Sequence, residues 1–225
     1  MGKRMAQRND SEKASDKWVG VHHSAQPVDY DMACQHMDHC VGGLKGGNGQ
    51  ELLWFLHHPP LYTYGARTDP AHIVMAKNTG LPVHLSKRGG QLTYHGPGQR
   101  IIYGMIHLRQ RGMGVTEYIG MLQQWIISAL NRCGIDGRVL PGFIGVWTAL
   151  GKVASIGVRV SGGISSHGLA INVGHDPMLR GGFGAVIPCG LEKTSMVTVS
   201  ELCARVTLQD IDAALLATNP FYDHG

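Results

Sequence analysis

The sequence predicts a single α/β (α+β) domain in which helices flank a mixed β-sheet. Residues 115–132 carry apolar side chains at a spacing of three to four and are followed by Gly134, which is typical of a helix and its end. Residues 153–160 alternate with period two, and the Gly-rich turn at 161–164 leads into a second strand over 165–173. Because no internal repeat and no linker interrupts the chain, these elements are expected in one mixed α/β fold.

Shorter elements are predicted around these two landmarks. A sparse apolar pattern indicates a helix over 28–41, and two glycine-rich stretches, 42–49 and 88–98, are expected to be irregular. Thr198 with Glu201 and Thr207 with Asp210 have the spacing of capping boxes, which mark the starts of two closing helices. Apolar runs predict buried strands over 51–56, 81–85 and 101–108.

Length and composition describe a globular chain. At 225 residues with 43% hydrophobic residues, it is long enough for a core and too apolar to be disordered as a whole. No stretch approaches the roughly 18 apolar residues of a membrane helix. Residues 1–20 are polar and are expected to form a flexible tail, with one domain over 21–225.

Charge and cysteine content narrow the compartment and the partners. The net charge of +4 allows an acidic partner, but no basic run is interleaved with aromatic residues, so no nucleic-acid partner is expected. The five cysteines are odd in number and form no CxxC, which indicates reduced thiols. Together with the lack of a secretory signal pattern, this predicts a cytoplasmic protein without a membrane partner.

A cluster of zinc-type ligands occurs early, in the order Cys34, His36, His39 and Cys40. Cys and His are the ligands that zinc prefers. Four ligands within seven residues of one helix point around much of its circumference, however, and cannot converge on one tetrahedral ion. We therefore expect a partly exposed helix and no metal site.

The segment Arg88–Gln99 is rich in glycine and polar side chains. Its paired glycines let the backbone approach a ligand, and successive N–H groups could hold a carbonyl or phosphate oxygen. It is neither a P-loop, because no Gly-Lys-Ser/Thr follows, nor a dinucleotide fingerprint, because its strand comes after it. Alone, such a segment is more often an ordinary turn.

Three further residues carry reactive side chains. Lys152 opens the first hairpin strand; such a lysine is usually solvated, but small apolar neighbours would desolvate it, lower its pKa and make it a base. His167 lies within the second strand, where a hydrogen-bonded core histidine is the commoner case. Cys189 lies in a Pro-Cys-Gly turn, where a thiol is accessible, although a lone turn cysteine is more often inert.

In this order, the three segments resemble the octanoyl-[acyl-carrier-protein]:protein octanoyltransferases of lipoate biosynthesis. The family motif Arg-Gly-Gly-x-x-Thr-x-His-Gly-Pro-Gly-Gln matches Arg88–Gln99. Its Lys-(apolar)-Ala strand followed by a His-Gly-(apolar)-Ala-(apolar)-Asn-Val strand matches Lys152–Val173, and its Pro-Cys-Gly matches Pro188–Gly190. The resemblance runs from about Tyr30 to Leu202, and three motifs at compatible spacing are far more specific than one.

The resemblance implies the fold of biotin and lipoate ligase catalytic domains and a reaction in two half-steps without a cofactor. Cys189 would take the octanoyl group from octanoyl-acyl carrier protein as a thioester, with Lys152 as its acid/base partner. A specific lysine of a lipoyl domain, in a 2-oxoacid dehydrogenase or a glycine cleavage carrier protein, would then accept the group as an amide. Substrate-binding positions implied in the same way are Arg88, Gly89, Gly90, Thr93, Tyr94, His95, Gly96, Ser155, Ile156, Gly157, His167, Gly168, Leu169 and Ala170.

The chain departs from the family at two places. A Glu-His-Pro-Pro run is common after the first strand, and His57 replaces its glutamate here; residues 145–150 also match loosely. An alternative function is an ATP-dependent lipoate or biotin ligase, which would use the lysine without needing Cys189. A carrier-binding module with decayed motifs and a zinc-binding interaction domain are two further alternatives. Intact Lys152 and Cys189 favour octanoyl transfer over all three.

Overall fold

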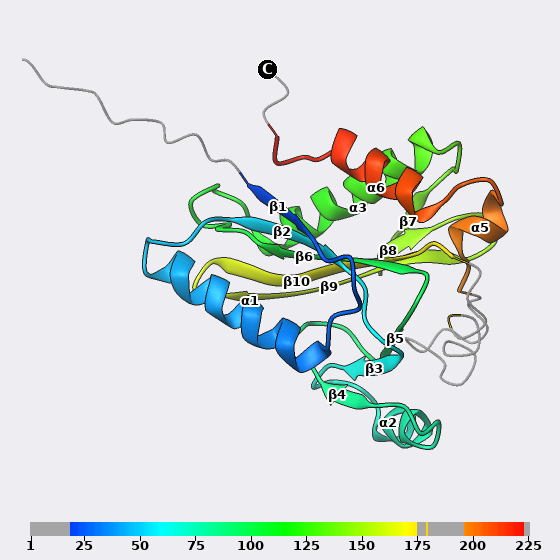
Figure 1. The fold of residues 1–225 in the computed structure, drawn as a ribbon, viewed down its shortest axis with the longest axis horizontal. Coiled ribbons are helices and arrows are strands. Elements are labelled where there is room, and N and C mark those ends of the chain that lie inside the picture. The colour runs from blue at the N-terminus through cyan, green and yellow to red at the C-terminus, as the bar shows by residue number, and fades with distance from the viewer. Residues whose placement is uncertain (1–18, 175–178, 180–195, 223–225) are drawn as a thin grey trace, which may run out of the picture.

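A mixed sheet of seven strands forms the centre of the computed structural model, which describes residues 19–174, 179 and 196–222 (Figure 1). Strands β1 and β2 pair in parallel, whereas the other neighbours in the sheet are antiparallel. The predicted mixed sheet is therefore confirmed. In spatial order the strands are β1 (Gly20–His23), β2 (Leu52–Leu56), β6 (Gln99–Met105), β10 (Ile164–Asn172), β9 (Lys152–Ser161), β8 (Phe143–Trp147) and β7 (Arg138–Leu140).

Helix α1 (Tyr30–Lys45) covers one face of this sheet (Figure 1). Its N-terminus is capped by Asp29, whose Oδ1 accepts hydrogen bonds from two backbone N–H groups of the first turn. The helix was predicted to end at residue 41, with a loop from 42, and this was wrong. It continues to Lys45 because Leu44 extends the buried stripe of Met37 and Val41 at helical spacing.

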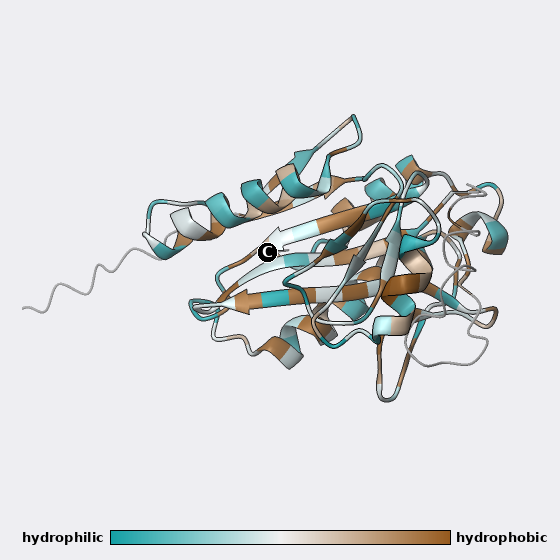
Figure 2. Cartoon of the chain, turned by 90° about the horizontal axis from the view of Figure 1, so that it is seen from below, coloured by the Kyte–Doolittle hydropathy of each residue, from teal (hydrophilic) through white to brown (hydrophobic). Residues whose placement is uncertain are grey.

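Helices α3 (Val115–Arg132) and α6 (Leu208–Ala217) cover the opposite face (Figure 1). The large core lies between them and the sheet, and the central strands carry its long hydrophobic stretches, brown in Figure 2. Both predicted capping boxes are present, at the starts of α5 (Val199–Leu202) and α6. The predicted helix over 115–132 is confirmed with those bounds.

A second, three-stranded sheet lies beside one end of the large sheet (Figure 1). Its order is β4 (Val83–Leu85), β3 (Leu61–Tyr64) and β5 (Thr93–His95), and α2 (Pro70–Lys77) packs next to it. Strand β5 lies within the segment 88–98, which was predicted to be irregular throughout. Three residues are too short for a period-two signal, and pairing with β3 fixes their conformation.

The β9–β10 hairpin is the long ladder on which the site depends. Its turn is Gly162-Gly163, with φ values of +65° and +84°, which match the two positive angles of a type I′ turn. The predicted hairpin is thus confirmed, with the second strand beginning at Ile164. None of the helices in the described part of the chain is long and apolar enough to cross a membrane.

Candidate active site

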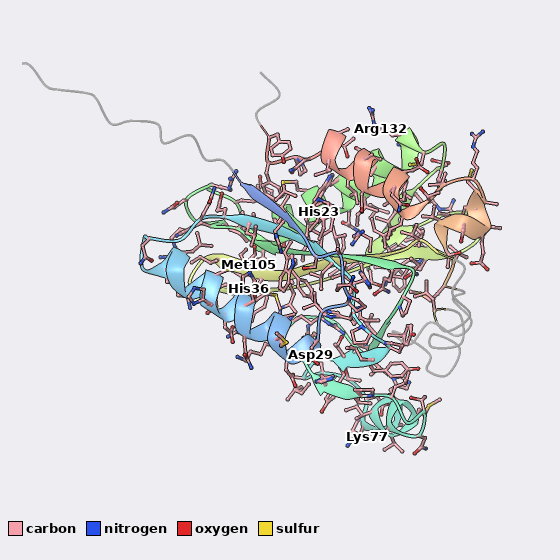
Figure 3. All side chains as sticks on the ribbon, in the orientation of Figure 1. His23, Asp29, His36, Lys77, Met105 and Arg132 are labelled. Atoms are coloured by element: carbon pink, nitrogen blue, oxygen red, sulfur yellow. The ribbon has the colours of Figure 1, made fainter. Side chains whose placement is uncertain are left out.

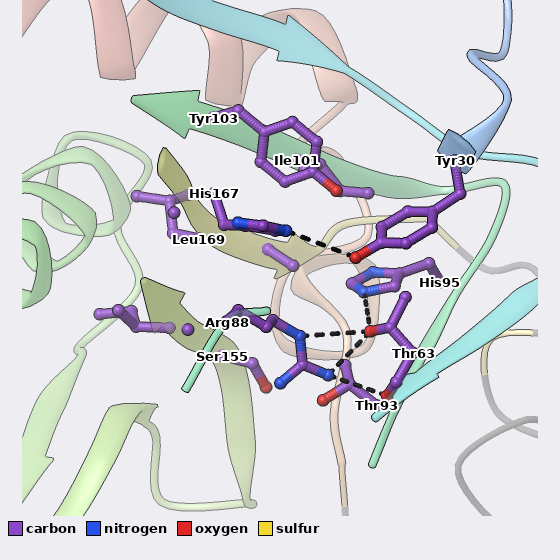
Figure 4. A pocket seen from close by; sticks show the side chains of 14 residues that line it. Tyr30, Thr63, Arg88, Thr93, His95, Ile101, Tyr103, Ser155, His167 and Leu169 are labelled. Carbon is purple, nitrogen blue, oxygen red and sulfur yellow. Dashed lines mark hydrogen bonds between the residues drawn. The ribbon is translucent and has the colours of Figure 1, made fainter. Parts of the chain in front are cut away.

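A cavity lies where the small sheet meets β6, β9 and β10 (Figure 4). We call it the inner cavity. Its walls mix aromatic, aliphatic and small side chains with a few polar groups, as is usual for small-molecule sites. The lining residues are Tyr30, Thr63, Arg88, Thr93, His95, Ile101, Tyr103, Ser155, Ile156, Gly157, His167, Gly168, Leu169 and Ala170.

A chain of directed hydrogen bonds forms one wall of the inner cavity (Figure 4). Arg88 donates from Nε and Nη2 to the Thr63 hydroxyl at 3.2 and 2.7 Å, so that hydroxyl directs its own hydrogen to His95 Nε2, 3.1 Å away. His95 then donates from Nδ1 to Gln99 Oε1 at 2.7 Å. Burial holds the pKa of His95 well below its usual value. His95 is therefore neutral and engaged at both nitrogens, which leaves neither nitrogen available as a base.

The opposite end of the inner cavity is closed by three side chains. Tyr30 donates its hydroxyl hydrogen to Ser86 Oγ at 2.7 Å. His167 Nε2 lies 3.4 Å from each of these two oxygens, and Figure 4 shows its contact with Tyr30. Burial lowers the pKa of His167 to about 3, so its ring is uncharged at neutral pH.

A third buried histidine supports the cavity from behind. His58 donates from Nδ1 to the carbonyl of Val28 at 2.5 Å, and its Nε2 accepts from the Tyr103 hydroxyl at 2.8 Å. Desolvation lowers its pKa to about 4. The histidines at this cavity are therefore neutral near pH 7, which suits an apolar ligand.

The backbone conformation restricts which residues can occupy positions 167 and 168. Gly168 cannot carry a side chain, because a Cβ there would lie 2.2 Å from the carbonyl oxygen of Ile102 on β6. His167 has φ of +58°, and in the described residues it is the one non-glycine residue with a positive φ. Such a conformation is costly and is typically retained where the surrounding structure enforces it for function.

A wider groove holds Lys152, and we call it the outer groove. Its lining includes Arg67, Val115, Phe143, Trp147 and Lys152. Phe143 is 40% exposed, whereas Lys152 is only 9% exposed. The groove thus combines accessible apolar side chains with one nearly buried amine.

Lys152 is held by two features of β8. Its Nζ lies 5.0 Å from the centre of the Trp147 ring, within the range of a cation–π contact. Gly145, with φ of +133°, leaves the space that the lysine occupies, because a Cβ there would lie 2.6 Å from Lys152 Cε. The prediction that desolvation lowers the pKa of Lys152 stays a prediction.

The two cavities are continuous. Five residues line both of them, namely Arg88, Thr93, Ser155, Ile156 and Gly157. The glycine-rich segment rests on β9 at this junction, with Gly89 N–H donating to the Val158 carbonyl at 2.9 Å. A Cβ at Gly157 would lie 2.9 Å from the Gly89 oxygen, so this approach depends on glycine.

The structure brings most of the predicted site residues together. Gly89 and Gly90 line the outer groove with Lys152, and the predicted residues from Arg88 to Ala170 that line the inner cavity are Arg88, Thr93, His95, Ser155, Ile156, Gly157, His167, Gly168, Leu169 and Ala170. Tyr94 and Gly96 line neither space: Tyr94 packs against Tyr62, and a Cβ on Gly96 would lie 2.3 Å from the Tyr94 hydroxyl. Cys189 lies outside the described residues.

Several functional positions were not identified from the sequence. Tyr30, Thr63, Ile101 and Tyr103 line the inner cavity, and their elements are far apart in the chain. Gly145 and Trp147 belong to the loosely matching stretch before Lys152. The sequence signal that could have identified Gly145 and Trp147 is their spacing of two residues shortly before Lys152.

The cysteine–histidine cluster lies on α1, where Figure 3 labels His36. The Nε2 atom of His36 is 3.6 Å from the Sγ atom of Cys40, one helical turn away. No group of three His, Cys, Asp or Glu side chains in the described ranges could hold a metal ion. His57, the other departure from the family motif, lines neither the inner cavity nor the outer groove.

Comparison with known proteins places these features in a family. Residues 29–219 match the family described as lipoyl protein ligase A/B catalytic domain. An octanoyltransferase of Paramagnetospirillum magneticum is 40% identical over 202 residues, which cover 88% of this chain and 93% of that protein. An octanoyltransferase of Caulobacter vibrioides is 38% identical over 208 residues, covering 89% of this chain and 90% of that protein.

Solved structures agree on the fold. The bipartite lipoate protein ligase of Thermoplasma acidophilum, studied with its E2 lipoyl domain, superimposes with a TM-score of 0.64. It is 16% identical, and the match covers 89% of this chain and 81% of that one. This likeness confirms the predicted fold class. From its sequence and its fold together, the chain belongs to the lipoyl protein ligase A/B catalytic domain family.

Proposed function

We propose that the chain transfers an octanoyl group from a carrier thioester to a lipoyl-domain lysine, through a thioester on Cys189. The chain is an octanoyltransferase of lipoate biosynthesis, as its relatives at 37–40% identity over most of their length are named. The route through Cys189 and Lys152 is what we add to that activity.

The continuity of the inner cavity with the outer groove carries the proposal. A thioester held in the outer groove near Lys152 would direct its acyl chain past Ser155 and Gly157 into the inner cavity. Burial of an acyl chain there contributes about 0.8 kcal/mol for each methylene. The histidines around the cavity are neutral near pH 7, so they offer no positive charge to an anionic ligand and suit an uncharged acyl chain.

In the first half-reaction, the amine of Lys152 takes the proton of the Cys189 thiol. The thiolate attacks the carbonyl carbon of the carrier thioester, a new C–S bond forms, and the bond to the carrier sulfur breaks. Lys152 returns the proton to the departing carrier thiol. Since one thioester replaces another, the exchange is nearly isoenergetic and needs no ATP.

In the second half-reaction, the amine of the acceptor lysine attacks the carbonyl of the acyl-enzyme. A C–N bond forms, the C–S bond to Cys189 breaks, and Lys152 takes the proton that the attacking nitrogen loses. That proton restores the Cys189 thiol. An acyl donor and a lipoyl-domain acceptor follow from the family in general terms. We propose octanoyl-acyl carrier protein as donor, and lipoyl domains of 2-oxoacid dehydrogenases or the glycine cleavage carrier as acceptors.

Intact-mass spectrometry tests the proposal directly. Mixing the protein with octanoyl-acyl carrier protein is expected to add one octanoyl mass to the wild type and none to Cys189→Ala. Cys133→Ala is the matched control, because Cys133 lies at the end of α3 outside both cavities. Labelling that maps to Cys34, Cys40, Cys133 or Cys203 would falsify the assignment. Octanoylation of a lipoyl domain that requires ATP and free octanoate would instead indicate a ligase.

A further inference from the structure

A third space lies behind the inner cavity, and we call it the back cavity. It lies between α1 and the strands beneath it. Its apolar walls include Met37 and Leu85, and its rim is charged, with Asp38 bridging to Lys87 at 3.3 Å and to Arg159 at 3.6 Å.

Among the residues that the structure describes, Tyr30 and His167 line both the inner cavity and the back cavity. The outer groove and the back cavity have no described lining residue in common. The three spaces therefore form a series in which the inner cavity is the middle member. In the described part of the chain, Tyr30 and His167 lie between the inner cavity and the back cavity.

The passage between them is closed by a triangle of side-chain atoms. Tyr30 Oη and Ser86 Oγ are 2.7 Å apart, and each lies 3.4 Å from His167 Nε2. A methylene needs about 3.5–4.0 Å to each neighbouring atom. No acyl chain fits between atoms that are themselves only 3.4 Å apart.

His167 is retained at this position despite two unfavourable features. Its backbone has φ of +58°, and its Nδ1 is buried without a hydrogen-bond partner in the described part of the chain. Both features cost stability. They are consistent with selection of the imidazole for its place in the wall rather than for its contribution to folding.

We infer that Tyr30 and His167 form an end wall that sets the maximum length of the acyl chain. The inference rests on the proposed function, because it places the octanoyl chain in the inner cavity. In that placement the far end of the octanoyl chain faces this wall. A longer chain would need the back cavity, which the Tyr30–Ser86–His167 triangle separates from the acyl site.

The test compares acyl loading of Cys189 from carriers bearing C8, C10, C12 and C14 chains, measured by intact mass in single turnover. Wild-type loading is expected to fall sharply above C8–C10. Tyr30→Leu and His167→Gly open the wall, and His167→Gly also relieves the positive φ. Because each additional buried methylene is worth about fourfold in binding, the C12-to-C8 loading ratio should rise at least tenfold in both variants.

Tyr118→Leu is the matched control, because Tyr118 is an equally buried tyrosine that lines neither the inner cavity nor the back cavity. Its C12-to-C8 ratio should equal that of the wild type. Cooperative thermal unfolding checks that each variant is folded. If Tyr30→Leu and His167→Gly both fail to fold, Tyr30→Phe decides, since it removes only the oxygen that lies 3.4 Å from His167.

Two results would overturn the end wall while leaving the proposed function intact. One is wild-type loading of C14 as fast as C8, and the other is an unchanged ratio in the folded variants. Failure of the proposed function has a different signature: the wild type would then load no chain of any length on Cys189.

Discussion

The inner cavity and the outer groove meet at five shared residues but are built differently. Hydrogen bonds fix the walls of the inner cavity, where Arg88, Thr63, His95 and Gln99 form one directed chain. The outer groove instead presents exposed apolar side chains such as Phe143, together with the nearly buried amine of Lys152.

This difference suggests that the inner cavity selects the acyl chain and that the outer groove holds the groups that react. The inner cavity has hydrogen-bonded walls and neutral histidines near neutral pH, so it is suited to select a chain by length and polarity. The outer groove holds Lys152, the proton acceptor of the proposed mechanism, and has an accessible surface on which we propose that carriers dock. Changes in the groove should therefore alter rate, whereas changes around the inner cavity should alter stability and substrate choice.

The largest expected effect is on rate, from Lys152→Ala. In the proposed mechanism, loss of the amine removes the proton acceptor of both half-reactions, so acylation and transfer should fall together by about 10²–10⁴-fold. Single-turnover acylation and octanoyl transfer to a lipoyl domain measure the two steps. The apparent affinity for the acyl chain should change little, because the inner cavity is intact.

Lys152→Arg sharpens this prediction. A guanidinium keeps the positive charge near the Trp147 ring but does not release its proton at any working pH, so this variant should be nearly as impaired. An arginine variant with close to full activity would show that the lysine acts only as an electrostatic partner of the thiolate. His95, engaged at both ring nitrogens, could not then supply the base without rearrangement.

The sequence predicted the parts of this fold that carry periodic signals. Helix α3 and the β9–β10 hairpin were identified because their apolar spacing extends over many residues. Strands β3 and β5 were not predicted, since three or four residues give no reliable period and pair only through long-range contacts. The small sheet, which forms one side of the inner cavity, was therefore missing from the prediction.

For the site, motif order identified residues that share a cavity but not what each one does. Arg88 was expected to bind substrate, and the structure shows its guanidinium fastening β3 to the glycine-rich segment through Thr63 and Gln91. Tyr94 and Gly96, from the same motif, pack against each other instead of lining the cavity. Tyr30 and Tyr103 reach the cavity from α1 and β6, and only tertiary structure brings those elements together.

The second prediction is that the folded protein loses stability in acid because histidines at the inner cavity are buried. His58 has a pKa of about 4 in the folded protein and an ordinary value of 6.5 when unfolded. Between these values the unfolded chain binds more protons, so stability is complete above pH 6.5 and is lost as pH falls toward 4. The loss from this one group is about 3 kcal/mol, and His167 adds to it in the same direction.

Urea unfolding across this pH window measures the effect. In His58→Gln the decline in unfolding free energy between pH 6.5 and 4 should be shallower than in the wild type. The same substitution at His39, exposed on α1, is the control and should leave the decline unchanged, because that ring faces water in both states. Equal slopes in all three proteins would show that burial of His58 does not set the acid sensitivity.

The third prediction breaks the outer groove without removing the lysine. Gly145→Ala places a methyl group 2.6 Å from Lys152 Cε and from the Ala154 carbonyl oxygen, so the amine must shift. A displacement of this kind should lower kcat by about 10–100-fold. Gly112→Ala is the control: it has a positive φ of +63° and nothing within 4 Å of its Cβ, so it tests backbone strain alone. Similar kcat values in the two variants would argue against a steric role for Gly145.

The smallest expected effect is on docking at the outer groove. The chain has a net charge of +4, and acyl carrier proteins are expected to be acidic, so dilute buffer should favour encounter through long-range attraction. Raising the salt to physiological ionic strength should increase the KM for the carrier about threefold and change kcat less.

Arg67 is exposed in the groove, and Arg67→Gln should weaken this salt dependence. Arg205→Gln should not, because Arg205 lines a separate depression with Arg132, at the far end of α3 from the groove residue Val115. If KM is indifferent to salt, or if both arginine variants respond alike, the carrier docks through the apolar side chains of the groove rather than through its charge.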